Sequence, residues 1–122
     1  MAGYTAAEIE RISAVTLATA DMRQAVRFYR ALGFVLRYGG EDASFTSFVV
    51  GPTYLNLEAR RSMAPAPSWG RVILYVSDVD AMHRRVRDLG LSAPAPADAP
   101  WGERFFHVSD PDGHELSFAR PL

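Results

Sequence analysis

The sequence contains an internal repeat. When the chain is compared with itself at an offset of 57 residues, the separation of Asp21 and Asp78, seven identical pairs fall in register within a stretch of about 20 positions. They are Val15/Val72, Leu17/Leu74, Asp21/Asp78, Arg27/Arg84, Arg30/Arg87, Leu32/Leu89 and Gly33/Gly90. A repeat of this length is typical of two copies of one supersecondary unit, each too small to bury its own apolar face. The chain is therefore expected to fold as two paired modules.

Each copy begins with the pattern of a strand followed by a helix. Apolar residues alternate over 14–18 and 71–75, and each run leads to an aspartate and then to helical periodicity. Asp21 suits a helix N-cap, and Gly33 and Gly90 suit the left-handed position after a helix. Further strands are predicted at 34–38, 45–50 and 54–59 in the first copy and at 91–93, 104–109 and 115–120 in the second.

These elements predict an α+β fold of two tandem β-α-β-β-β modules, which form a curved mixed sheet around a concave ligand cavity. We expect an N-terminal extension over 1–11, a first module over 12–61, a linker over 62–68 and a second module over 69–122. The linker is the first of two stretches rich in proline and alanine, and the second, 92–100, is expected to form a loop over a sheet edge.

Composition excludes several classes of partner and chemistry. Thirteen basic residues balance 14 acidic ones, so no positive field attracts nucleic acid. No apolar run approaches the length of a membrane span, and the N-terminus lacks the layout of a signal peptide, so we expect a cytoplasmic protein. The chain has no cysteine and all its basic residues are arginine. Thiol nucleophiles and Schiff-base lysines are therefore excluded.

Four segments carry a family resemblance. They are Ile12–Leu17, Asp21–Phe34, Val72–Asp78 and Trp101–Leu116, the last of which contains Asp-Pro-Asp-Gly. Because the Asp-Pro-Asp-Gly segment follows two strand-helix repeats at equal spacing, the chain resembles the vicinal oxygen chelate superfamily, which includes glyoxalases, extradiol dioxygenases and bleomycin-resistance proteins. The resemblance runs from Ile12 to Leu122 and implies the fold described above.

The resemblance also implies where a metal ion would be bound. Metalloenzymes of the superfamily hold one divalent ion with His, Gln or Glu side chains from four strands. The matching positions here are Ala14, Asn56, Arg71 and Ser117. A methyl, an amide, a guanidinium and a hydroxyl are poor ligands for zinc, iron or manganese. We therefore expect no metal and no cofactor.

Strand alternation predicts which side chains line the cavity, because residues i and i+2 face the same side. The resemblance adds Phe48 and His107, which stand three residues before Gly51 and Asp110, a position whose side chain reaches the ligand in related fosfomycin-type enzymes. Large aromatic walls with a few polar groups suit a flat, partly aromatic small molecule. The expected ligand-binding residues are Thr16, Phe48, Asn56, Glu58, Trp69, Arg71, Tyr75, Trp101, Phe105, His107 and Ser117. His83 is expected to be solvated on the second helix, and His114 is expected at the tip of a hairpin.

Two of these residues have alternative roles. His107 could act as a general base or as a hydrogen-bonded cavity histidine. Arg71 could bind a ligand oxygen or pair internally with Glu58 or Glu115.

The leading hypothesis is metal-independent sequestration of an aromatic drug or metabolite, as in the bleomycin-resistance branch. One alternative is a glyoxalase- or dioxygenase-like lyase, isomerase or proton-transfer enzyme that uses His107 and Arg71. Another is a diverged module kept for protein association. We also expect a homodimer, which would cover exposed sheet edges.

Overall fold

The chain forms two modules with the same order of elements. The computed structural model describes residues 7–61 and 69–122, so the predicted linker lies outside the described residues. The first module holds β1 (Ala14–Thr19), α1 (Met22–Ala31), β2 (Val35–Tyr38), β3 (Phe45–Val50) and β4 (Thr53–Ala59). The second holds β5 (Arg71–Tyr75), α2 (Val79–Asp88), β6 (Ala97–Asp98), β7 (Glu103–Ser109) and β8 (Glu115–Pro121). The predicted α+β fold of tandem β-α-β-β-β modules is confirmed.

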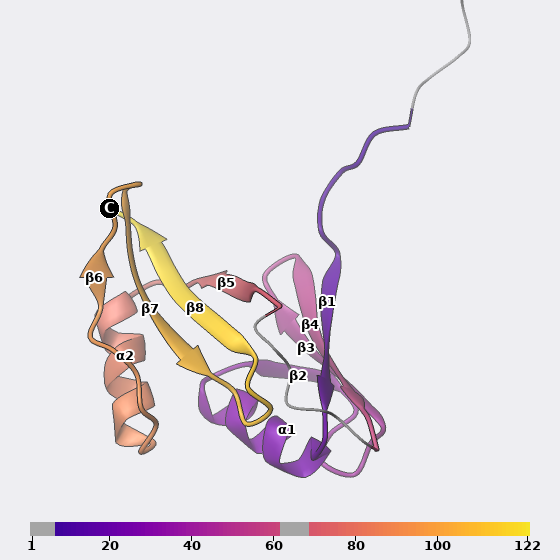
Figure 1. Ribbon diagram of the computed structural model, residues 1–122. Coiled ribbons are helices and arrows are strands. Elements are labelled where there is room, and N and C mark those ends of the chain that lie inside the picture. Colours follow the sequence, from indigo (N-terminus) through magenta and orange to yellow (C-terminus); the bar gives the residue numbers. More distant parts are fainter. Residues whose placement is uncertain (1–6, 62–68) are drawn as a thin grey trace, which may run out of the picture.

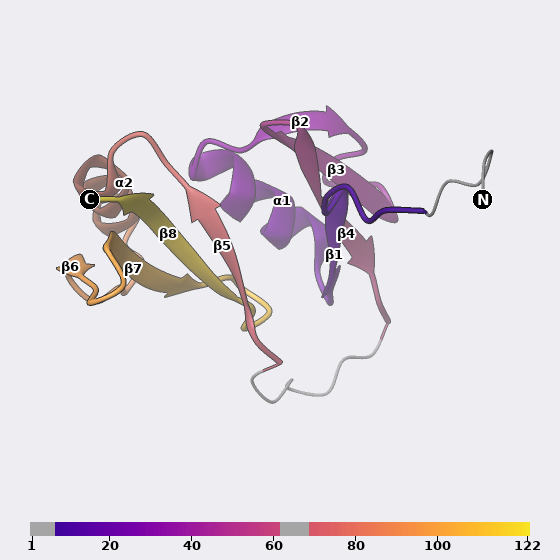
Figure 2. The same ribbon diagram turned by 90° about the horizontal axis from the view of Figure 1, so that it is seen from above.

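Each module has its own mixed sheet. The strand orders are β1-β4-β3-β2 and β5-β8-β7-β6, with one parallel pair in each sheet, β1 with β4 and β5 with β8. The two sheets stand side by side and diverge toward the top of Figure 1, with α1 across the bottom. Seen from above, β1 and β5 are the edge strands at which the sheets approach each other (Figure 2).

The helices begin and end where the repeat predicts. Asp21 Oδ1 accepts a hydrogen bond from the backbone N–H of Gln24 at 3.1 Å, and Asp78 Oδ1 does the same for Ala81 at 3.0 Å. These aspartates satisfy N–H groups that have no partner inside the helix. Gly33 and Gly90 follow the helices with φ of 104° and 78°, a region that side chains disfavour. Within the described residues, no helix is long and apolar enough to cross a membrane.

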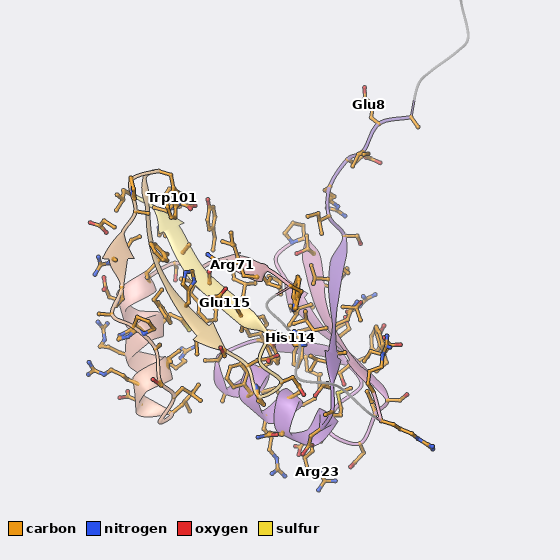
Figure 3. The ribbon with its side chains drawn as sticks, viewed as in Figure 1. Glu8, Arg23, Arg71, Trp101, His114 and Glu115 are labelled. Carbon is orange, nitrogen blue, oxygen red and sulfur yellow. The ribbon has the colours of Figure 1, made fainter. Side chains whose placement is uncertain are left out.

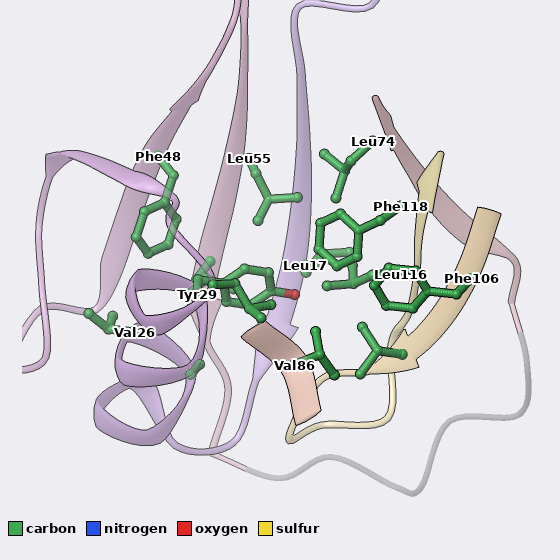
Figure 4. Close-up of a cluster of buried hydrophobic side chains, with 14 of the residues drawn as sticks. Leu17, Val26, Tyr29, Phe48, Leu55, Leu74, Val86, Phe106, Leu116 and Phe118 are labelled. Atoms are coloured by element: carbon green, nitrogen blue, oxygen red, sulfur yellow. The ribbon is translucent and has the colours of Figure 1, made fainter. Parts of the chain in front are cut away.

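The core joins the two modules. Leu17 and Leu55 of the first module and Leu74 and Phe118 of the second belong to one buried cluster (Figure 4). Tyr29 of α1 and Val86 of α2 are fully buried in the same cluster. A single copy of the repeat on its own would expose part of this shared apolar surface to water.

Phe48 also belongs to this core, so its predicted place in the cavity is wrong. It is 0% exposed and packs against Tyr29 and Phe34. The prediction placed Phe48 and His107 at equal distances before their turns, which gives the same face of the sheet only if the two turns shift the strand register equally. The β3–β4 turn has two residues, whereas five residues separate β7 from β8. A one-residue shift moves a strand side chain to the opposite face.

Two further expectations for the second module are wrong, and a third is correct in position only. The strand predicted over 91–93 does not form, and its place is taken by β6, where Ala97 pairs with Phe105. His83 is buried rather than solvated, with its ring edge-on to Phe106 at 5.1 Å between centroids. His114 does lie in the β7–β8 turn, but it is buried, and its Nε2 lies 2.8 Å from the Ala18 carbonyl.

Polar contacts fix the second module against the first. Asp112 Oδ1 accepts from the backbone N–H of Ala20 at 2.9 Å, and Arg85 Nη1 donates to the Leu32 carbonyl at 2.8 Å. The second contact satisfies a carbonyl at the C-terminus of α1, where a positive charge is favourable. These bonds and the shared core set the relative positions of the two sheets.

Candidate ligand-binding site

The face of each sheet opposite the shared core, called here the front face, carries most of the predicted site. On the second sheet, Arg71 is in register with Glu115, Ile73 with Ser117, and Tyr75 with Ala119. His107 pairs with the same Ser117, and Phe105 with the same Ala119. The alternate residues Leu74, Leu116 and Phe118 are buried in the core. The predicted alternation is therefore correct on these three strands.

A chain of polar contacts crosses this face. Arg71 Nε lies 3.1 Å from Glu115 Oε2, and Arg71 Nη1 lies 3.4 Å from His107 Nε2 (Figure 3 labels Arg71 and Glu115). His107 Nδ1 makes a short contact with Ser117 Oγ. Because a guanidinium can only donate hydrogen bonds, His107 Nε2 accepts from Arg71. The neutral ring then carries its proton on Nδ1, which donates a hydrogen bond to Ser117 Oγ. Both ring nitrogens are thus engaged.

The alternatives left open for Arg71 are partly resolved by this geometry. Glu115 is its internal partner, whereas Glu58 is paired with Arg60 at 3.1 Å. The side chains of Arg71 and Glu115 remain 46% and 32% exposed. A pair with this much contact with solvent contributes little to stability.

An aromatic group occupies the other end of the face. Trp101 lies 5.7 Å from Phe105 between ring centroids, and Phe105 lies 5.0 Å from His107. Glu103 Oε1 accepts from Trp101 Nε1 at 2.9 Å, and Glu103 Oε2 accepts from the Tyr75 hydroxyl. That hydrogen bond raises the pKa of Tyr75. One carboxylate therefore orients two aromatic rings that are 64% and 68% exposed.

A groove of about 460 Å³ runs between the edge strands β1 and β5. Trp69, Arg71 and Tyr75 line it from the second module, and Ala14 and Tyr54 line it from the first. Trp69 is held in place by His114, whose Nδ1 accepts from Trp69 Nε1 at 2.9 Å. The groove is lined mainly by aromatic and aliphatic side chains.

The front face of the first sheet holds a second, more polar group. Asn56 Nδ2 donates to Thr16 Oγ1 at 3.3 Å, and Ser47 is in register with Asn56. The Ser47 hydroxyl is buried without a hydrogen-bond partner among the described residues. Ser47 therefore takes the place that the sequence analysis assigned to Phe48.

The structure thus divides the predicted residues between two sheets. Thr16, Asn56 and Glu58 lie on the first, and the second carries Arg71, Tyr75, Phe105, His107 and Ser117, with Trp69 and Trp101 beside its strands. Glu103 was missed, although it is two residues before Phe105 on the same strand and alternation alone would have placed it on the front face.

The residues at the superfamily's metal positions do not fit a divalent ion. Arg71 brings a fixed positive charge that is held by Glu115, and Ser117 Oγ is engaged by His107. Among the described residues, no three His, Cys, Asp or Glu side chains are placed to hold a metal.

Comparisons with known proteins agree with the fold. The family model described as Glyoxalase/Bleomycin resistance protein/Dioxygenase superfamily matches residues 11–118. A bleomycin resistance determinant encoded on the transposon Tn5 superposes with a TM-score of 0.77 at 23% identity, covering 92% of this chain and 98% of that one. A bleomycin-binding protein in complex with bleomycin gives 0.75 at 23% identity, covering 93% and 100%. At these identities the likeness shows the fold alone.

Two further relatives are similar in sequence or fold. A glyoxalase/bleomycin resistance protein/dioxygenase from Nocardioides gives a TM-score of 0.73 at 25% identity, covering 96% of this chain and 87% of that one. An uncharacterized protein of Mycobacterium bovis is 36% identical over 66 residues, which are 51% of this chain and 43% of the relative. The match thus spans less than half the length of that curated relative.

Proposed function

Because the chain belongs to the glyoxalase/bleomycin resistance protein/dioxygenase superfamily, we propose that it binds and sequesters an aromatic small molecule in the cytoplasm without a metal. The ligand would occupy the groove between β1 and β5 and extend over the front face of the second sheet. The two bleomycin-related neighbours support a binding role for this fold. They do not identify the ligand of this chain.

The observation that carries this proposal is the groove itself. Its volume of about 460 Å³ lies in the range of small-molecule sites, roughly 300–1,000 Å³. Trp69, Tyr54 and Tyr75 supply aromatic surface on both of its sides. Offset stacking of aromatic rings contributes favourable free energy beyond that of burying their surface. A flat ligand with aromatic rings matches this lining.

The alternative function is a lyase, isomerase or proton-transfer enzyme of the glyoxalase or dioxygenase type, with His107 as general base. A general base needs a free lone pair within hydrogen-bond reach of the substrate. The Nε2 lone pair of His107 faces Arg71, and its Nδ1 is engaged by Ser117. This geometry favours binding over proton transfer.

We also expect a homodimer, in which a second copy shields exposed apolar residues. Val35 on the first sheet and Ile73 on the second are 63% and 60% exposed. Both stand on strands rather than on isolated loops, so association with a second copy would remove apolar surface from water. Ile73 also lines the groove, so an interface that includes it would adjoin the ligand site. Sedimentation velocity over a range of protein concentrations measures the mass of the assembly. A monomer mass at every concentration would contradict the expected homodimer.

A thermal-shift screen of aromatic antibiotics and metabolites, followed by mass analysis of each hit, tests the function. A ligand that binds only the folded state raises the melting temperature, and the rise grows with the logarithm of its concentration once that exceeds Kd. Stabilisation with the ligand unchanged supports binding, and conversion of the ligand supports the enzyme. Trp69→Ala should abolish the shift, whereas Leu89→Ala, at an exposed position after α2 and outside the groove, should preserve it.

A further inference from the structure

Glu103 gives the front face of the second sheet an uncompensated negative charge. Arg71 and Glu115 neutralise each other, and no ion pair to Glu103 forms within the described residues. The basic residue next to it in sequence, Arg104, is committed to Asp80 and Asp98 at 2.9 and 3.0 Å. The charge lies beside the exposed rings of Tyr75 and Trp101. We call the rings of Tyr75, Trp101 and Phe105 the aromatic platform.

The hydrogen-bonding groups of Glu103, Tyr75 and Trp101 offer a ligand acceptors only. The Tyr75 hydroxyl and the Trp101 indole N–H both donate to Glu103. Neither group therefore has a proton left for a ligand, because a phenol has one O–H and an indole one N–H. Each carboxylate oxygen can still accept another bond, since it has two lone pairs. A ligand that reaches this end of the face finds acceptors and no free donor among these three residues.

The shape of the face limits the ligand further. Tyr75 and Phe105 stand on either side of Ala119, the residue with which both are in register. Neighbouring strands lie about 4.8 Å apart, so the backbones of Tyr75 and Phe105 are roughly 10 Å apart, and the Tyr75 side chain crosses this span to reach Glu103 on β7. A flat ring system can stack on the exposed rings of Tyr75 and Trp101.

From charge, hydrogen bonding and shape together, we infer that Glu103 selects flat, positively charged nitrogen heterocycles, which lie on the aromatic platform and direct an N–H toward its carboxylate. Cations are attracted to aromatic faces as well as to the carboxylate. This inference rests on the proposed binding function and specifies the class of ligand. Glu103 has a second effect, because its bonds to Tyr75 and Trp101 hold the platform rings in place.

Three related dyes separate the contributions of charge and shape. 9-Aminoacridine is a cation at pH 8, acridine is neutral, and 9-anthracenecarboxylate is an anion, while all three have three fused rings. Fluorescence titration of the full chain should show the cation binding at least tenfold more tightly than acridine, and the anion binding most weakly. Equal or reversed affinities would overturn the inference.

Two variants assign this selectivity to Glu103. Glu103→Gln removes the charge at nearly constant shape and should weaken 9-aminoacridine about tenfold while changing acridine less than threefold. Asp42→Asn removes one negative charge from the first module, where Asp42 pairs with Arg23, and should change neither affinity. An equal loss for both dyes in Glu103→Gln would show that Glu103 only positions the rings.

Other outcomes separate failure of this inference from failure of the proposed function. If none of the three dyes binds while an aromatic compound from the thermal-shift screen does, the charge selection is wrong and the binding function stands. If neither the dyes nor any screened compound binds, the proposed function fails. If Glu103→Gln converts a dimer to a monomer, the platform is an interface between copies and the inference is overturned.

Discussion

The hydroxyl of Tyr29 donates a 2.7 Å hydrogen bond to Oδ2 of Asp110, which joins α1 of the first module to the β7–β8 turn of the second. Both residues are buried. Oδ1 of the same carboxylate accepts from the backbone N–H groups of Asp112 and His114 at 2.9 and 2.8 Å. A single buried carboxyl group therefore fixes its own turn and the contact between modules.

Tyr29→Phe should lower the free energy of unfolding by about 1–3 kcal/mol, because it leaves a buried acceptor without its donor. Tyr38→Phe is the matched control, since Tyr38 is 49% exposed, and should change stability by less than about 0.5 kcal/mol. Urea denaturation of the two variants measures the difference. Equal effects would mean that the Tyr29–Asp110 bond contributes nothing.

Asp110 should make stability depend on pH. Burial raises the pKa of Asp110 above its ordinary value, against hydrogen bonds from Tyr29 and the His114 backbone that lower it. A carboxyl whose folded pKa is raised contributes stability that is present below its unfolded pKa and is lost as pH rises through the folded pKa. Relative to wild type, Asp110→Asn should therefore gain stability as pH rises from about 3 to 7. A constant or falling difference in urea denaturation across this range would contradict the raised pKa.

The repeat supplies a matched pair of glycines. A Cβ on Gly33 would lie 2.5 Å from Arg85 Nη1, whereas a Cβ on Gly90 would meet no atom within 4 Å. Both have positive φ, so alanine at either position should cost about 1–3 kcal/mol from backbone strain. Gly33→Ala should cost about 1 kcal/mol more, since Arg85 must give up its bond to the Leu32 carbonyl. Equal melting temperatures for the two variants would show that Arg85 moves aside without cost.

The Arg71–Glu115 pair should contribute little to stability. In a double-mutant cycle with Arg71→Ala and Glu115→Ala, we expect a coupling energy below about 1 kcal/mol, because both side chains are partly exposed. If Arg71 also touches the ligand, Arg71→Ala should lower affinity by roughly 1.5–3 kcal/mol with little loss of fold stability. A large stability loss with affinity intact would assign Arg71 a structural role alone.

The protein should need no divalent metal. A chelator is expected to leave the melting temperature unchanged, since Arg71 and the engaged Ser117 hydroxyl offer no ligands for zinc, iron or manganese. Elemental analysis of the purified protein checks this directly. About one tightly bound ion per chain would contradict the assignment of Ala14, Asn56, Arg71 and Ser117 to the metal positions.

The sequence by itself determined the features that depend on short-range patterns. The offset of 57 residues predicted two modules, and Asp21 and Asp78 predicted where both helices begin, because an N-cap is satisfied within three residues. Alternation predicted the front faces of β5 and β8, because the side-chain period of a strand is set by its own backbone.

Only the tertiary structure decided features that depend on turn length or on distant partners. The two-residue β3–β4 turn moved Phe48 into the core and Ser47 to the front face. His114 is buried because Trp69 and the Ala18 carbonyl lie beside it, residues 45 and 96 positions away. Arg71 pairs with Glu115 and not with Glu58 because β5 is next to β8 in the same sheet, while Glu58 lies on the other sheet beside Arg60. A one-dimensional pattern fixes the side of a strand on which a residue stands, whereas its partners are fixed by how the strands and sheets pack.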